Sequence, residues 1–99
     1  MFTIIVPCNN EESCIADCLS ALLEQCDLPS DHAIQVIVAA NGCVDRTVAL
    51  AYGLAPRLSA AGYDPLVLDL PVGNKINALN EAEAKAIHAG RVFVDADVV

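Results

Sequence analysis

Residues 91–99 read Arg-Val-Phe-Val-Asp-Ala-Asp-Val-Val, an apolar run that ends in two carboxylates one residue apart. The β-branched and aromatic residues 92–94 predict a short buried strand, and Asp95 and Asp97 follow its end. In open α/β sheets, ligands bind at the carboxyl ends of the strands. Two carboxylates there repel each other, and a hard divalent cation shared with phosphate oxygens relieves that repulsion. The stretch therefore predicts a metal and diphosphate site, with a solvated acidic turn as the alternative for this triplet alone.

Composition narrows the class of protein. The 99 residues suffice for one domain with a small core, and the hydrophobic share of 56% fits strands buried on both faces. The formal net charge of -8 and the lack of a basic cluster argue against nucleic acid and anionic membrane surfaces as partners. No apolar run approaches the ~20 residues of a membrane span. Pro7 ends the first apolar run early, so we expect neither a transmembrane segment nor a signal peptide.

The cysteines are odd in number and include no Cys-X-X-Cys pair; they are Cys8, Cys14, Cys18, Cys26 and Cys43. Cys14 and Cys18 lie four residues apart on a predicted helix and could bind zinc, but no second pair of ligands follows. Small buried thiols in a reducing compartment are the preferred interpretation. We therefore expect a cytoplasmic location.

Predicted strands and helices alternate along the chain. Apolar β-branched runs favour strands, and apolar positions at i, i+3, i+4 and i+7 favour helices. The expected elements are a strand at 2–6, a helix from an Asn9 or Asn10 cap to near Gln25, a strand at 34–40, a helix capped by Asp45 and ended or restarted by Pro56, a strand at 66–70 led in by Pro65, a helix at 75–89 ended by Gly90, and the strand at 92–94. This βαβαβαβ pattern predicts an α/β fold with a parallel four-stranded sheet and right-handed crossovers.

Four loops of this sheet would share one edge, at residues 7–11, 41–45, 73–75 and 95–97. Lys75 is the only cation that we expect on this rim, where a lone amine beside two carboxylates suits a metal-bound diphosphate. The alternative for Lys75 is a solvated lysine at the start of a helix. The alternative for Asn41 and the glycine after it is a plain turn. Neither Gly-X-Gly-X-X-Gly nor the P-loop motif is present, which weakens dinucleotide and NTPase interpretations.

Four stretches resemble, in order, the signatures of family 2 glycosyltransferases of the GT-A fold. Residues 4–12 are similar to an apolar strand followed by Pro, any residue, Asn and acidic residues. Residues 38–47, Val-Ala-Ala-Asn-Gly-Cys-Val-Asp-Arg-Thr, resemble Val-Val-Asp-Asp-Gly-Ser-Thr-Asp-Arg-Thr. Residues 73–80 resemble Gly-Lys-X-X-Ala-Leu-Asn, and residues 94–97 match the metal-binding Asp-X-Asp. Four ordered motifs over the whole chain are far more specific than any one of them.

The resemblance implies a site for a nucleotide-diphosphate sugar, most commonly a UDP-sugar. The residues that would bind the donor are Pro7, Asn9, Glu11, Asn41, Lys75 and Asp95. Asp97 would hold Mn²⁺ or Mg²⁺ on the diphosphate, where the metal stabilises the leaving nucleoside diphosphate. Asn41 stands where the family commonly has an aspartate that reads the base. An amide donates as well as accepts hydrogen bonds, so this departure leaves the choice of base open.

The resemblance also sets expectations for the extent of the domain. Family members continue well past Asp-X-Asp, so the acceptor pocket and the catalytic base are expected beyond Val99. We expect residues 1–99 to be a single truncated GT-A nucleotide-sugar-binding domain, part of a glycosyltransferase but inactive alone. Its fold would be a three-layer, Rossmann-like half-fold with strand order 3-2-1-4, as in similar half-folds.

Two other functions stay open. One is a non-catalytic nucleotide-binding or self-associating fragment, and the weaker is a GT-A-like nucleotidyltransferase, whose glycine-rich start with a basic residue is absent here. In the order 3-2-1-4 the fourth strand lies at an edge, and an uncovered edge invites pairing with another chain. Three helices also cannot cover both faces of four strands evenly. We therefore expect self-association through residues 91–99.

Overall fold

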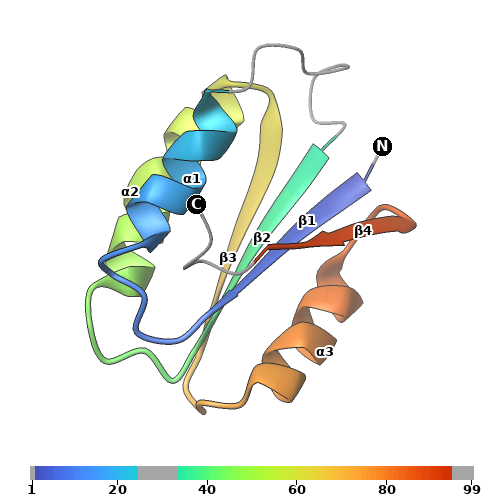
Figure 1. Cartoon of the computed structure of the whole chain (residues 1–99). Coiled ribbons are helices and arrows are strands. Elements are labelled where there is room, and N and C mark those ends of the chain that lie inside the picture. Colours follow the sequence, from blue (N-terminus) through green and yellow to red (C-terminus); the bar gives the residue numbers. More distant parts are fainter. Residues whose placement is uncertain (1, 25–33, 95–99) are drawn as a thin grey trace.

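Strands and helices alternate as the sequence pattern predicts. The structure is a computed structural model that describes residues 2–24 and 34–94 (Figure 1). Its elements are β1 (Phe2–Cys8), α1 (Ile15–Leu23), β2 (Ile34–Asn41), α2 (Thr47–Ala60), β3 (Tyr63–Leu70), α3 (Lys75–Lys85) and β4 (Gly90–Phe93). Asp95, Asp97, Gln25 and Cys26 lie outside the described residues. No helix in the described part of the chain is long and apolar enough to cross a membrane.

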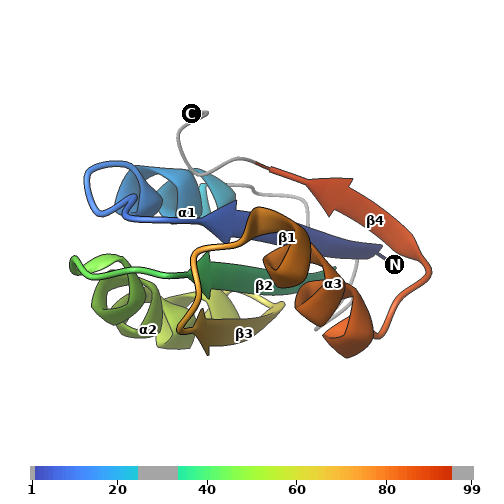
Figure 2. The same ribbon diagram turned by 90° about the horizontal axis from the view of Figure 1, so that it is seen from below.

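The four strands form one parallel sheet in the order β3-β2-β1-β4. Helices α1 and α2 cover one face of this sheet and α3 covers the other, which gives three layers (Figures 1 and 2). The central strands are buried because both of their faces are covered, and residues 34–41 of β2 are buried without exception. The predicted three-layer, Rossmann-like fold with strand order 3-2-1-4 is confirmed.

The face under α1 and α2 holds the larger part of the core. Alternate residues of the central strands, such as Ile4 and Val36, pack there against Ile15 and Leu19 of α1 and Leu58 of α2. The face under α3 holds a second cluster of small and branched residues: Ile5, Ile37, Ala39, Ala78 and Ala82. We call these the α1/α2 face and the α3 face. Their unequal size means that most buried apolar area lies on one side of the sheet.

The third helix is shorter than its alanine-rich sequence predicts. We expected residues 75–89 to be helical and Gly90 to end the helix, but α3 ends at Lys85 and Gly90 begins β4. Ala86, the residue after α3, has an extended backbone. The Lys85 carbonyl accepts a hydrogen bond from the Gln35 side chain instead of from a further turn of helix. A buried tertiary contact therefore overrides local helix propensity.

Pro56 does not end or restart the second helix, contrary to our expectation. Helix α2 runs through it from Thr47 to Ala60. A proline has no amide hydrogen to donate to the preceding turn, yet Ala51 before it and Leu58 after it both pack in the core of the α1/α2 face. Packing on both sides of Pro56 holds the two halves in one helix.

The third strand begins earlier than predicted and includes Pro65. Strand β3 starts at Tyr63, which is 1% exposed and donates its hydroxyl to the Leu22 carbonyl at 2.7 Å. Because β3 lies at the edge of the sheet, a proline within it leaves few ladder bonds unmade. A distant contact of Tyr63 thus extends the strand to the residues before Pro65.

The start of the first helix and the burial of the fourth strand also differ from expectation. Neither Asn9 nor Asn10 caps α1, whose N-cap is Cys14, without a side-chain bond. Val92 and Phe93 form an edge strand as the predicted order requires, but they are not buried, since 43% and 55% of their surfaces are exposed. Within residues 2–24 and 34–94, α3 packs against β2 and β1 (Figure 2) and does not cover β4 to the same extent.

Candidate functional site

Three loops meet at the carboxyl ends of β1, β2 and β3, at the lower end of the sheet in Figure 1. A Cβ atom built on Gly42 would lie 2.6 Å from the Cα of Gly73 and 3.3 Å from the side-chain nitrogen of Asn9. Gly42 has a φ of +61°, which only glycine adopts without strain. The Gly42 amide also donates to the Leu70 carbonyl at 2.8 Å. The close approach of the Gly42 and Gly73 backbones therefore joins the loop after β2 to the loop after β3.

Two asparagines fasten the end of β1 to the end of β2. The side-chain amide of Asn9 donates to the Asn41 carbonyl, and the side-chain amide of Asn41 donates to the Cys8 carbonyl at 2.9 Å. Asn9 is exposed, whereas Asn41 is only 4% exposed. The side-chain amide of Asn41 thus binds the scaffold. A role for Asn41 in recognising a base stays a prediction and would depend on its side-chain oxygen.

Asn10 holds the loop that follows β2. Its backbone adopts a φ of 54°, a left-handed conformation that asparagine tolerates better than most residues. Its side-chain oxygen accepts the amides of Val44 and Asp45 at 2.8 and 3.3 Å. Its own amide donates to the thiol sulfur of Cys43 at 3.4 Å. The first and second loops are therefore joined by several hydrogen bonds.

Asp45 and Thr47 join the starts of the two helices on the α1/α2 face. The N-cap of α2 is Arg46, without a side-chain bond, so Asp45 does not occupy the N-cap position that we predicted; its carboxylate nevertheless accepts the amide of Thr47, the first residue of α2. It also accepts the Thr47 hydroxyl and the amide of Glu12. Thr47 in turn accepts the amide of Glu11 at 2.8 Å. The hydrogen bond from the Thr47 hydroxyl holds the pKa of Asp45 below its usual value.

The third loop brings a helix start and a lysine to the same rim. Asn74 caps α3, since its side-chain oxygen accepts the amide of Asn77 at 3.0 Å. Lys75 follows as the first residue of α3 and is exposed. The positive end of the helix dipole and a lysine amine both favour an anion. Arg46, also exposed, immediately precedes α2, so Lys75 is not the only cation near the rim, contrary to our expectation.

Cys8 and Pro7 lie inside the scaffold rather than on its surface. Pro7 is buried in β1 and pairs with Ala39 of β2. It therefore supports the loop that follows β1 instead of lying on the surface of the rim. Burial raises the pKa of the Cys8 thiol to about 12, with the nearby Cys43 as the next cause. The thiol therefore stays protonated at neutral pH and behaves as a small apolar group. The four cysteines in the described residues are all free thiols.

The described residues form no metal site by themselves. Within residues 2–24 and 34–94, no three His, Cys, Asp or Glu side chains gather as a metal site would require, and this includes Cys14 and Cys18. Asp95 and Asp97, the predicted donor and metal ligands, lie outside the described residues. The last described position, Val94, donates its amide to the Ile5 carbonyl at 2.9 Å, beside the middle of β1.

Of the predicted donor residues, the structure brings Asn9 and Asn41 into direct contact, and the amide of Glu11 binds Thr47 next to them. Sequence reasoning gave Asn10 only a possible role as a helix cap and gave Thr47 no role of its own, although both residues hold the loops together. The signal for Asn10 was present, because a second asparagine after a strand often takes a left-handed turn. The role of Thr47 depends on a partner 36 residues away, which spacing does not reveal.

Comparisons with known proteins agree with this geometry. A family model described as glycosyl transferase family 2 matches residues 3–99. The crystal structure of S. aureus TarS 1–349 matches with a TM-score of 0.77 and 26% identity over 97% of this chain and 27% of that chain. A structure of S. aureus TarS matches with a TM-score of 0.74 and 25% identity over 97% of this chain and 16% of that chain. TarS 1–349 in complex with UDP matches with a TM-score of 0.67 and 24% identity over 97% and 27%.

The search of curated proteins found no match. The chain spans only a quarter or so of TarS 1–349, 27% of its length. The family model, however, covers almost the whole chain, from residue 3 to residue 99. The GT-A-like sheet and the loops at its carboxyl ends fit that match. The chain therefore belongs to glycosyl transferase family 2.

Proposed function

We propose that this chain is the donor-binding part of a family 2 glycosyltransferase, a single nucleotide-sugar-binding domain over residues 1–99. It would bind a nucleotide-diphosphate sugar, with UDP as the nucleotide, for transfer of the sugar to an acceptor. Family membership supports the class of reaction. The choice of UDP draws on the UDP complex of TarS 1–349. A cytoplasmic location belongs to this proposal, because the four described cysteines are free thiols.

One observation carries the proposal. Three loops converge at the carboxyl ends of β1, β2 and β3, and Gly42 and Gly73 are in backbone contact there beside Asn9. In open α/β sheets this is the edge at which ligands bind. The exposed Asn9 can contact the base, while Lys75 at the start of α3 suits the diphosphate. The rim therefore offers a polar surface for the base and a cationic one for the phosphates.

The metal is part of the same proposal. Since the described residues gather no metal site of their own, a cation at the rim would depend on Asp97, with Asp95 near the ribose or sugar. Oxygen ligands of this kind suit Mn²⁺ or Mg²⁺, which can keep water and phosphate oxygens as further ligands. When bound, such a cation would stabilise the charge of the leaving nucleoside diphosphate.

Calorimetric titration with UDP tests the proposal. We expect UDP to bind more tightly with Mn²⁺ than with EDTA. In Asp97→Asn, the affinity for UDP in the presence of Mn²⁺ should fall about tenfold or more, ~1.4 kcal/mol. Lys75→Met should weaken UDP binding by about 1–3 kcal/mol, the range for a hydrogen bond to a charged group. Asp64→Asn is the matched control, because Asp64 lies near the amino end of β3, away from the rim.

The outcomes separate the parts of the proposal. UDP binding that Asp97→Asn and EDTA leave unchanged would refute the metal site and keep the nucleotide site. No UDP binding at millimolar concentration, with the fold intact by circular dichroism, would refute the donor site itself. Tighter binding of another nucleoside diphosphate would replace UDP and leave the class of ligand in place.

Self-association is a second candidate function, and the edge strand favours it. Among the strands of the described residues, β4 pairs with β1 alone, and its Val92 and Phe93 are 43% and 55% exposed. An apolar edge strand can pair with a second copy of the chain. Light scattering over a range of concentrations should show a dimer that Phe93→Lys disrupts. A monomer at the highest concentration would eliminate this function.

A further inference from the structure

Gln35 is a buried polar residue in the middle of an apolar sheet. It lies in β2, is 4% exposed, and pairs in register with Thr3 of β1. Its neighbours Val36 and Ile37 are fully buried and apolar. A buried amide without partners destabilises a protein by about 1–3 kcal/mol. Its presence there calls for a set of specific hydrogen bonds.

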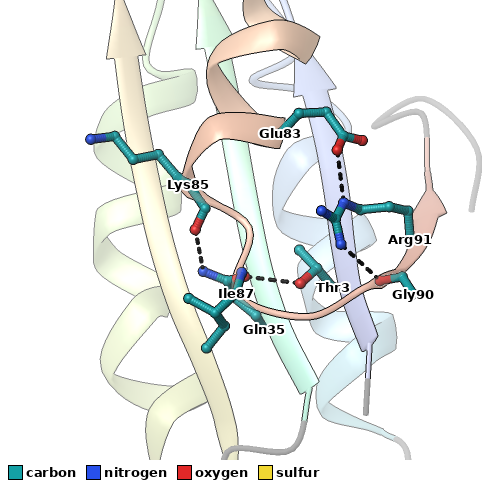
Figure 3. Close-up of polar contacts among 7 residues, drawn as sticks. All are labelled: Thr3, Gln35, Glu83, Lys85, Ile87, Gly90 and Arg91. Carbon is teal, nitrogen blue, oxygen red and sulfur yellow. Dashed lines mark hydrogen bonds and ion pairs between the residues drawn. The ribbon is translucent and has the colours of Figure 1, made fainter.

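The Gln35 side chain makes three hydrogen bonds on the α3 face (Figure 3). Its oxygen accepts the Thr3 hydroxyl at 2.9 Å and the Ile87 amide at 3.0 Å. Its nitrogen donates to the Lys85 carbonyl at 3.2 Å. Two of these three bonds go to the backbone of the segment between α3 and β4. Gln35 therefore holds the connection to the sheet more than it supports its own strand.

These bonds decide where α3 ends and where the chain turns back. The last carbonyls of a helix have no partner within the helix, and Gln35 satisfies that of Lys85. It also fixes Ile87, and only His88 and Ala89 lie between Ile87 and the first residue of β4. Two residues span only a few ångströms of chain, ~3.3–3.6 Å each when extended. The Ile87 anchor therefore leaves little freedom in where β4 begins.

The start of β4 sets its register against β1. Gly90 pairs with Phe2, Phe93 pairs with Ile5, and the amide of Val94 donates to the Ile5 carbonyl. A shift of one residue would turn every side chain of the strand to the opposite face. It would also move Val94 along β1 by one position. In the sequence, Asp95 follows Val94 directly and Asp97 comes two residues later.

We propose that Gln35 is a positioning residue that sets the register of β4 against β1, and so the position of Val94, the residue that precedes Asp95 and Asp97 in the sequence. The observation is a pair of hydrogen bonds made by the buried Gln35 side chain, whose nitrogen donates to the Lys85 carbonyl and whose oxygen accepts the Ile87 amide. The part that concerns register stands on the described residues alone. The part that concerns metal binding rests on the proposed function of Asp97.

Hydrogen exchange by NMR on the 99-residue chain tests the register. In the wild type, the amide of Ile87 should be protected, because its acceptor is a buried side chain. In Gln35→Leu, the amide of Val94 should exchange about tenfold faster or more, since its protection reports the local pairing of β4. The amide of Gly42, which bonds to Leu70 at the rim, is the internal reference and should stay unchanged.

Thr3→Val is the matched control variant. It removes one hydrogen bond to the same Gln35 oxygen and leaves the bonds to Lys85 and Ile87 in place. It should leave Val94 protected. Gln35→Met, which is of similar size but neither accepts the Ile87 amide nor donates to the Lys85 carbonyl, carries the same test if Gln35→Leu does not fold. An unprotected Ile87 amide in the wild type, or an unchanged Val94 amide in a folded Gln35 variant, would overturn the positioning role.

Titration with UDP then tests the link to the metal. In Gln35→Leu, the gain in UDP affinity on adding Mn²⁺ should fall about tenfold, while the affinity in EDTA changes less than about twofold. A general loss of stability would lower both affinities. If the Val94 amide responds but the wild type shows no gain with Mn²⁺, the proposed metal site fails and the register role stands. An unchanged Mn²⁺ gain with an altered Val94 amide would overturn the link to Asp97.

Discussion

The two faces of the sheet are built differently, although one chain and one set of strands form both. On the α1/α2 face, thirteen buried residues from three strands and two helices form the larger cluster. On the α3 face, five buried residues form the smaller one, and three of them are alanines. The α3 face adds the buried polar contacts of Gln35 and Thr3. We infer that apolar burial stabilises the first face and that hydrogen bonds specify the second.

The largest expected difference comes from removing one leucine from each face. Leu19 of α1 is fully buried, and Leu19→Ala should lower the free energy of unfolding by about 2–5 kcal/mol, since it leaves a cavity in the core. Leu79 of α3 is only partly buried, and Leu79→Ala should cost at most about 2 kcal/mol. Urea denaturation of both variants measures the two losses. Equal losses would contradict the unequal division of the core.

The next test compares two glycines, one at the rim and one on the exposed side of α2. Gly42→Ala should cost more than the ~1–2 kcal/mol of a left-handed alanine, because its Cβ would also lie 2.6 Å from the Gly73 backbone. Gly53 lies in α2 with no atom within 4 Å of an added Cβ. Gly53→Ala should therefore raise the free energy of unfolding by about 0.5–1 kcal/mol.

Thermal unfolding of the two alanine variants gives the sign of each change. Gly42→Ala should also weaken UDP binding, since it separates the loops after β2 and β3, and Gly53→Ala should not. A Gly42→Ala variant as stable as the wild type would show that the two loops can move apart without loss. That result would remove the contact between glycines as a constraint on the rim.

A third test uses pH and the thiol of Cys8, which lies on the α1/α2 face. The folded state holds the pKa of Cys8 at about 12, raised from 9.0 by burial. The unfolded chain loses that proton near pH 9, whereas the folded chain keeps it, so ionisation favours the unfolded state as pH rises. The contribution of Cys8 to stability is complete below pH 9 and is lost between about pH 9 and pH 12.

Urea denaturation between pH 8 and pH 11 should therefore show a flatter loss of stability in Cys8→Ala than in the wild type. Burial also raises the pKa of Tyr63, and that contribution is the same in both proteins. The comparison uses the slopes with pH, so a constant cost of the substitution does not affect it. Parallel curves would mean that Cys8 ionises with its ordinary pKa in the folded chain.

The same contrast explains which features could be predicted from the sequence. The runs at β1 and β2 are apolar on both faces, and their alternation with helices was enough to predict a parallel sheet, while its strand order was predicted from similar half-folds. The end of α3 was predicted wrongly because its determinant, Gln35, lies 50 residues from Lys85 along the chain. Local propensity carries no information about such a partner. Pro56 was misjudged for the same reason, since the packing of α2 outweighs the lost hydrogen bond.

The candidate site likewise has features that could be predicted from the sequence and features that could not. The four motifs placed Asn9, Asn41 and Lys75 on one rim, and the structure puts Asn9 and Asn41 in contact. The burial of Asn41 could not be predicted, because it depends on its bond to the Cys8 carbonyl on another strand. The roles of Asp95 and Asp97 stay predictions. The sequence pattern identifies which residues lie on the rim. The tertiary structure decides which of them remain exposed to a ligand.

The smallest expected effect concerns the ion pair between β4 and α3. The Nε of Arg91 lies 2.8 Å from a carboxylate oxygen of Glu83, and the two side chains are 24% and 42% exposed. Ion pairs that water reaches contribute little, about 0.2–1 kcal/mol, and salt screens them. A double-mutant cycle with Arg91→Met and Glu83→Gln should therefore give a coupling in that range, which falls as sodium chloride rises from about 0.05 to 0.5 M.

This ion pair joins β4 to α3 at the surface, whereas the buried Gln35 holds the end of α3 and the connection to β4 against β2 (Figure 3). If buried hydrogen bonds set the register of β4, breaking the ion pair should leave the Val94 amide protected, whereas changing Gln35 should not. A coupling well above about 1 kcal/mol that does not respond to salt, together with loss of Val94 protection in Arg91→Met, would reverse that order. The surface contact would then be the determinant of the register, and Gln35 would serve only to end α3.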